Sequence, residues 1–213
     1  MSDKPFVITI SHQFGSGGSY IGTTLAKQLS IPFIDRDILK RVADQLHMPE
    51  SDVEMRDERL SSFWESFSRV AVFSNPQISL TTNPYVLSDQ SLFELESEHI
   101  KHIGENTSAI ILGRCGRYIL RDHPNHFSLM VHADLPARVS RVRDLYQLSV
   151  SEAEKMIEST DKERGAYIHT FTKQDWMNVR LYDLCINTSH IGLDASVALV
   201  ESCVTSKLQG EHA

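Results

Sequence analysis

Short apolar runs alternate with amphipathic stretches of helical length along most of the chain. Residues 6–10 and 31–34 are apolar runs of strand length, and Ile21, Leu25, Ala26 and Leu29 recur between them at helical spacing. Further strands are predicted at residues 109–112, 127–133 and 184–187. Further helices are predicted from residue 35, at 135–146, from 149 to about 161 or beyond, and at 193–208. Buried strands separated by helices indicate an α/β fold with a parallel sheet that is covered on both faces.

One long segment interrupts this alternation. Residues 49–106 hold an aromatic-rich piece, a loop with two Asn-Pro pairs and a predicted helix at about 88–104. We interpret the segment as a mostly helical insertion in a single domain of 213 residues. The aromatic residues of the insertion favour packing over a platform for base stacking.

Composition and charge exclude several classes of protein. The formal net charge of -7 disfavours a protein that coats nucleic acid or an anionic membrane. The first apolar run is too short for a secretion signal, and no run reaches the length of a membrane span, so we expect a cytoplasmic protein. Three widely spaced cysteines, Cys115, Cys185 and Cys203, predict neither a disulfide framework nor a zinc site. The ten histidines lack a recognisable set of partner ligands.

The clearest chemical signal is a glycine-rich turn between the first strand and the first helix. The run SHQFGSGGSYI, residues 11–21, places three glycines where the chain turns from strand to helix. Glycines let backbone N–H groups approach a phosphate, and the start of the next helix attracts an anion. The turn is therefore a candidate phosphate site, although a tight turn without a ligand would have the same sequence.

The turn departs from the P-loop pattern GxxxxGK[ST]. With Gly17 on the second glycine, His12 falls on the first glycine and Gly18 on the lysine, while Ser19 takes the position of the metal-binding hydroxyl. The missing lysine normally offsets charge on the β- and γ-phosphates. His12 is a weak substitute, because an ordinary histidine pKa near 6.5 leaves the ring mostly neutral at pH 7.

Arginines follow the predicted strands at several places. Arg114 comes directly after the strand at 109–112, at the edge of the sheet where α/β proteins bind ligands. Arg138 and Arg141 share one helical face, and the polar stretch that holds Lys162, Arg164 and Tyr167 suits a mobile lid at about 149–173. Phosphoryl transfer needs several cations around the phosphates, although each arginine alone is typical of a solvated surface.

These motifs together resemble the cytidylate kinase-like family of P-loop proteins. The resemblance spans most of the chain, apart from the insertion and the C-terminal tail. It is carried by ITISHQFGSGG, IPFIDRDIL, IILGRCGRYIL, LMVHADLPARVSRV, STDKERGAYI and YDLCINTSHIGLD. It implies a P-loop kinase fold in three layers, with ATP and Mg²⁺ at the turn and a nucleoside monophosphate, CMP or dCMP, under the insertion.

The resemblance also implies roles for individual residues. The turn would bind ATP through His12, Gly15, Ser16, Gly17, Gly18 and Ser19, with Ser19 also at the Mg²⁺. The acceptor would be contacted by Asp35, Arg36 and Arg114, and Asp183 would either contact the substrate or hold an arginine. Arg138 would support the phosphate site, while Lys162 and Arg164 would reach the transferring phosphoryl group from the lid.

Three functions agree with the sequence. The favoured one is an ATP-dependent phosphotransferase that acts on a nucleoside monophosphate. The second is a protein that binds or senses nucleotides with little or no kinase activity, since the lysine is absent. The third is a P-loop kinase for a metabolite that is not a nucleotide.

Overall fold

The computed structural model describes residues 5–35, 89–113 and 115–210. The predicted helix after Asp35, most of the predicted insertion, Arg36 and Arg114 therefore lie outside the described residues.

Five parallel strands form a single sheet in the order β2-β3-β1-β4-β5. They are β1 (Val7–His12), β2 (Phe33–Ile34), β3 (Ala109–Leu112), β4 (His126–His132) and β5 (Leu184–Asn187). Each predicted strand is confirmed, although β2 has only two residues. Strand β1 lies in the middle, with Val7 opposite Ala109 on β3 and opposite His126 on β4.

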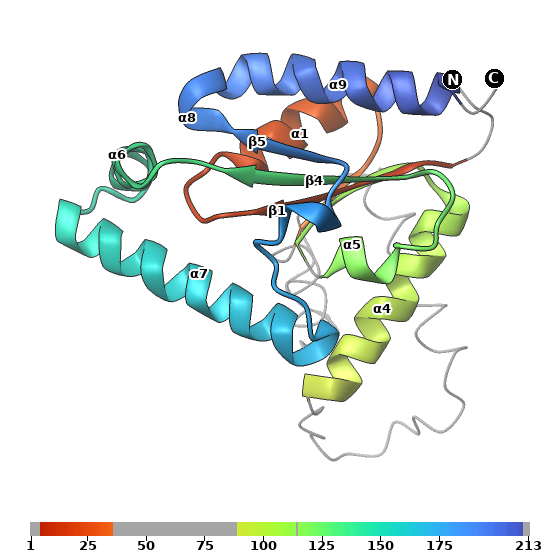
Figure 1. Ribbon diagram of the computed structural model, residues 1–213, viewed down its shortest axis with the longest axis horizontal. Coiled ribbons are helices and arrows are strands. Elements are labelled where there is room, and N and C mark those ends of the chain that lie inside the picture. The colour runs from red at the N-terminus through yellow and green to blue at the C-terminus, as the bar shows by residue number, and fades with distance from the viewer. Residues whose placement is uncertain (1–4, 36–88, 114, 211–213) are drawn as a thin grey trace, which may run out of the picture.

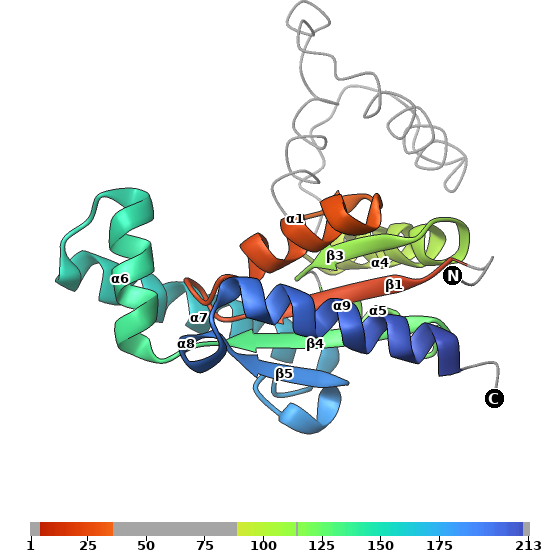
Figure 2. The same cartoon turned by 90° about the horizontal axis from the view of Figure 1, so that it is seen from above.

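Helices cover both faces of this sheet. The helices are α1 (Gly18–Leu29), α4 (Asp89–Asn106), α5 (Gly116–Ile119), α6 (Leu135–Tyr146), α7 (Val150–Thr172), α8 (Thr188–Ile191) and α9 (Leu193–Gly210), with a 3₁₀ turn η2 (Val179–Leu181). Figures 1 and 2 show α1 and α9 on one face and α4 and α5 on the other, so the described residues form three layers. In the described part of the chain, no helix is both long and apolar enough to cross a bilayer.

Alternation along the central strand divides the core into two halves. Ile8 and Ile10 face α1 and α9, where they pack in one buried cluster with Ile21 and Leu25. The neighbouring residue Val7 faces the opposite way and belongs to a second cluster. This second cluster contains Ile111 of β3, Ile100 and Ile103 of α4, and Ile119 of α5. A strand that is apolar on both sides fits the centre of a covered parallel sheet.

Helices α6 and α7 lie at the carboxyl ends of the strands (Figure 1). They pack on each other through Val139, Val142, Ala153 and Ile157. The predicted capping box opens α7, because the Ser149 hydroxyl accepts from the Glu152 amide while the Glu152 carboxylate accepts from Ser149. The segment predicted as a lid is thus one continuous helix of 23 residues.

Candidate functional site

The glycine turn has a backbone that glycine favours. Gly15 has a φ of 76° and Gly17 a φ of 93°, both in the left-handed region where other residues are strained. The Ser16 amide donates to the Gln13 carbonyl over 3.1 Å, which closes the turn on itself. The predicted order of strand, turn and helix is confirmed.

The start of α1 presents amide groups to the turn. The first helical bond runs from the Ile21 amide to the Gly17 carbonyl over 3.0 Å. The amides of residues 17–20 precede that bond, and within the described parts of the chain they have no acceptor. Unpaired amides at the positive end of a helix dipole attract an anion. This geometry fits a phosphate group.

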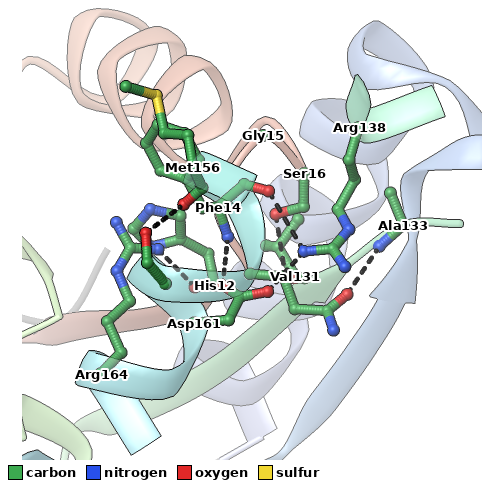
Figure 3. A network of polar contacts seen from close by, with 12 residues as sticks. His12, Phe14, Gly15, Ser16, Val131, Ala133, Arg138, Met156, Asp161 and Arg164 are labelled. Carbon is green, nitrogen blue, oxygen red and sulfur yellow. Dashed lines mark hydrogen bonds and ion pairs between the residues drawn. The ribbon is translucent and has the colours of Figure 1, made fainter. Parts of the chain in front are cut away.

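Two charged residues from α6 and α7 bond to the backbone of the turn at Phe14. Asp161 accepts from the Phe14 amide over 2.8 Å and pairs with the Arg138 guanidinium over 2.5 Å. Arg138 also donates to the Phe14 carbonyl over 3.3 Å. The Arg138 and Asp161 side chains are 9% and 18% exposed, so this is a mostly buried ion pair that fixes the backbone of the turn (Figure 3).

Two further arginines contact carbonyls of the turn. Arg164 of α7 donates to the His12 carbonyl over 2.9 Å, and its guanidinium lies 5.6 Å from the centre of the Phe14 ring. Arg141 of α6 donates to the Gly15 carbonyl. Burial lowers the pKa of Arg141, although a guanidinium remains charged at neutral pH. Cations therefore surround a turn whose amides face an open space.

That open space is a cleft of about 500 Å³. One wall is the turn and the start of α1, another is formed by α6 and α7, and the ends of β2 and β3 close it. Its lining includes His12, Gly15, Gly17, Gly18, Ser19, Asp35, Arg141, Tyr146, Arg164, Tyr167 and Trp176. The volume and the mixture of polar and aromatic groups suit a small organic phosphate.

The His12 side chain packs directly on the first residue of α1. A Cβ atom added to Gly18 would lie 2.5 Å from the His12 Cβ and 2.6 Å from its Cγ, closer than atoms can approach. Burial, and second the charge of Arg164, lower the pKa of His12 to about 3. His12 therefore brings no positive charge to the turn at neutral pH.

The structure brings many of the predicted residues together. His12, Gly15, Gly17, Gly18, Ser19, Asp35 and Arg164 all line the cleft. Ser16 does not, because its side chain is fully buried and its hydroxyl donates to the Val131 carbonyl over 3.1 Å. Arg138 lies behind the turn in the pair with Asp161 and is not among the lining residues.

Two other predicted residues lie away from the cleft. Lys162 is exposed on α7 and stands about 200° around the helix from Arg164, given 3.6 residues per turn. Asp183 precedes β5, toward the amino ends of the strands. Its carboxylate accepts from the Ser128 amide and hydroxyl and from Lys207. Partial burial would raise the pKa of Asp183, but these hydrogen bonds outweigh it and lower the pKa. In this structure the carboxylate therefore links β5 to β4 and α9 and does not face the cleft.

Sequence reasoning gave no site role to Asp161 or Trp176, and it noted Arg141 only as a cation on the same helical face as Arg138. A signal for Asp161 exists, since Asp161, Arg164 and Ile168 recur at i, i+3 and i+7 and so share one face of α7. Trp176 follows α7 and packs against Gly165, where a Cβ would lie 3.0 Å from the indole nitrogen. No local pattern indicates that contact.

Magnesium ligands are sparse in this part of the molecule. In the described ranges, no group of three His, Cys, Asp or Glu side chains could hold a metal ion. Ser19 and Asp35 both line the cleft. Mg²⁺ commonly takes one or two protein oxygens and completes its shell with water and substrate phosphates, and both residues carry oxygens of that type.

Comparisons with known proteins agree with this architecture. The model of the Cytidylate kinase-like family matches residues 7–190. A cytidylate kinase of Natronomonas pharaonis is 24% identical over 202 residues, which cover 94% of this chain and 90% of that protein. An uncharacterized protein from Eubacterium ventriosum is 22% identical, with a TM-score of 0.70 over 95% of this chain and 99% of the other.

A more distant solved structure has the same fold. A gluconokinase from Sinorhizobium meliloti is 15% identical and has a TM-score of 0.52, over 99% of this chain and 98% of the other. The predicted α/β fold of the P-loop type is therefore confirmed.

Proposed function

The chain belongs to the cytidylate kinase-like family, and from this premise we propose that it is an ATP-dependent phosphotransferase whose acceptor is a nucleoside monophosphate. The observation that carries the proposal is the set of amides at residues 17–20, which have no acceptor among the described residues and open into a cleft that Arg164 also lines. Backbone amides bind a phosphate group whatever molecule carries it. The guanidinium adds the positive charge that phosphoryl transfer requires.

The phosphates of ATP would lie on the turn. Gly15 and Gly17 shape the backbone, and the amides of Gly17, Gly18 and Ser19 point toward the phosphate oxygens. Arg141 stands on the opposite wall of the cleft and holds the Gly15 carbonyl. The neutral His12 contributes shape rather than charge.

The transfer itself needs little covalent participation by the protein. A phosphate oxygen of the acceptor attacks the γ-phosphorus of ATP, and the bond from that phosphorus to the β–γ bridging oxygen breaks. The products are ADP and a nucleoside diphosphate. Catalysis of this kind rests on in-line positioning and on stabilising charge at the transferring group. Arg164 is the residue we assign to that charge.

Magnesium would be held by the Ser19 hydroxyl and, through water or directly, by Asp35. When bound, the ion supplies charge neutralisation between the phosphates. The acceptor would occupy the part of the cleft toward Asp35, Tyr167 and Trp176. CMP and dCMP are the first acceptors to test, because a relative that is 24% identical is a cytidylate kinase.

The decisive experiment combines binding and turnover. Calorimetric titration with ATP and Mg²⁺, repeated in the presence of CMP, should give saturable binding, and CMP should stimulate production of ADP and CDP. The other nucleoside monophosphates are then compared under the same conditions. Lys155→Ala serves as a control, since Lys155 is an exposed cation of α7 outside the cleft.

Other outcomes point to the two alternative functions. Saturable ATP binding without turnover of any nucleoside monophosphate would favour a nucleotide-binding or sensing protein. ATP binding that does not respond to CMP or dCMP, together with turnover of another metabolite, would favour a different acceptor class. A folded protein that binds no nucleotide would overturn the proposal.

A further inference from the structure

The lysine position of the turn is blocked by a neighbouring side chain. We propose that Arg164 supplies the cation that a P-loop carries in its lysine, and that His12 excludes any side chain from position 18. This inference rests on the proposed function, since it assigns the source of charge at the same phosphate site. It predicts that a histidine at position 12 and a lysine at position 18 are mutually exclusive in this chain.

First, position 18 is a glycine because of a steric contact and not because of its backbone conformation. Gly15 and Gly17 have positive φ values, whereas Gly18 does not and already belongs to α1. Its backbone therefore accepts any residue. What forbids a side chain is contact, because an added Cβ would lie within 2.6 Å of both the Cβ and the Cγ of His12. Those atoms are close to the backbone of β1 and cannot swing away as the end of a long side chain would.

The second step concerns where the replacement charge lies. Arg164 donates to the carbonyl of the same residue, His12, whose ring covers Gly18. After burial, the guanidinium is the second cause that lowers the pKa of the His12 ring, so its charge acts beside the turn. A guanidinium has five N–H donors, and a bond to the carbonyl is compatible with contacts to phosphate oxygens.

The third step concerns what fixes Arg164. Asp161 lies one helical turn earlier on the same face of α7 and holds the Phe14 amide of the turn. Tyr167, three residues later, lines the cleft and donates to Glu96 of α4 over 3.3 Å. Contacts on both sides of Arg164 therefore set the distance of its helix from the turn. Figure 3 shows Arg164 and Asp161 on α7 beside the turn.

Nucleotide affinity tests the assignment of charge. Arg164→Ala should weaken ATP binding by about 10- to 100-fold, the range for loss of a charge-assisted contact, while AMP binding should change by less than about twofold. Arg164→Lys should retain part of the affinity, and Lys155→Ala should retain all of it. Equal losses for ATP and AMP, or no loss for ATP, would overturn the assignment.

A rescue variant tests the exchange of positions. The double change His12→Gly with Gly18→Lys restores the pattern GxxxxGK[ST] between residues 12 and 19. Added to Arg164→Ala, it should return ATP affinity to within about threefold of the wild type. Gly18→Lys alone should not rescue Arg164→Ala. Rescue without the change at His12, or failure of the folded triple variant to recover ATP affinity, would contradict the proposal.

A double-mutant cycle between positions 12 and 18, measured by thermal denaturation without nucleotide, tests whether His12 excludes a side chain at position 18. Gly18→Ala should lower the melting temperature by about 3–8 °C, as overpacking does, and the same change should cost much less in the His12→Gly background. Equal costs in both backgrounds would overturn the exclusion.

Different results would overturn the proposed function and the inference about Arg164 and His12. A folded wild type that binds no nucleotide removes the proposed function and the charge assignment together. A wild type that binds and turns over nucleotide, but is indifferent to Arg164→Ala, removes this inference and the role assigned to Arg164, while the phosphotransferase activity stands.

Discussion

At the scale of single residues, the most constrained contact of the site is the Arg138–Asp161 pair. Its two side chains come from different helices, and both bond to the backbone of Phe14. A mostly buried ion pair contributes modest net stability when intact, but removal of one partner leaves a desolvated charge. The pair therefore ties the position of the turn to the packing of α6 against α7.

Asp161→Asn should remove the negative charge of this side chain but keep its hydrogen bond to the turn. The amide oxygen can still accept from the Phe14 N–H, whereas Arg138 loses its counterion. We expect a loss of about 3 kcal/mol in the free energy of unfolding, measured by urea denaturation. We also expect a higher KM for ATP, because the turn is no longer held.

The matched control replaces a carboxylate of the same helix that faces solvent. Glu158→Gln on α7 should change stability by less than about 0.5 kcal/mol. An Asp161→Asn variant as stable as this control would show that the ion pair does not hold the turn.

Residue types were easier to predict than the directions of their side chains. The turn could be predicted from its glycines because a backbone with positive φ favours this residue type. Lys162 and Arg164 look equivalent in a polar stretch interpreted as a lid, and only a continuous helix places them on opposite sides. Ser16 is similar, because its inward hydroxyl bond to Val131 depends on a strand that is 115 residues away.

At the scale of elements, α7 connects the phosphate site to α4. The Phe171 ring stacks on Phe93 of α4, with centroids 4.5 Å apart and planes at 11°. Phe171 also lies 4.7 Å from Tyr167, which lines the cleft. The far end of α7 is thus anchored by aromatic contacts, while its middle carries Asp161 and Arg164.

Phe171→Ala should loosen this anchor. Loss of a half-buried ring and of two aromatic contacts should cost about 2 kcal/mol of stability, measured by thermal or urea denaturation. Because Tyr167 loses its neighbour, the KM for the acceptor should rise more than the KM for ATP. Phe171→Leu, which keeps apolar bulk, should recover most of the stability. An unchanged acceptor KM in Phe171→Ala would separate Tyr167 from the acceptor.

The strands and the long helices were predictable, whereas the four-residue helices were not. The spacing of apolar residues indicated β3, α6 and β5 with their observed bounds, and the capping box indicated the start of α7. The four-residue helices α5 and α8 are too short for one period to repeat. The sequence left the end of α7 open, since its second half mixes polar and aromatic residues around Gly165.

At the scale of the whole molecule, alternation predicts a covered parallel sheet but not the order of its strands. The central position of β1 depends on hydrogen bonds to β3 and β4, more than 95 residues away along the chain. It places the turn after β1 at the middle of the carboxyl edge, between helices from both sides. The site therefore follows from topology as much as from the glycine motif.

Neutral histidines in the interior make the stability of this fold depend on pH. Burial is the main cause that lowers the pKa of both His99 and His126 to about 4, and the charge of His102 adds to the effect at His99. His126 shares a 2.7 Å hydrogen bond with the Thr9 hydroxyl, and His99 is a buried residue of α4. In the unfolded chain both rings would titrate near 6.5.

Acidification from pH 7 to pH 5 should therefore destabilise the protein. Between about pH 6.5 and 4 the unfolded state binds more protons than the folded state, so stability falls as pH falls through this window. Each ring should contribute on the order of 1–2 kcal/mol at pH 5, which together lower the melting temperature by about 5–10 °C. His12, whose pKa is lowered to about 3, acts in the same direction within this window, whereas Asp183 and Glu152, whose pKa values are also lowered, act at about pH 4.5 and below. A variant with His99→Gln and His126→Gln should be less stable at pH 7 but should lose less between pH 7 and 5. A wild-type melting temperature that is constant over that range would show that these rings are protonated as easily in the fold as in the unfolded chain.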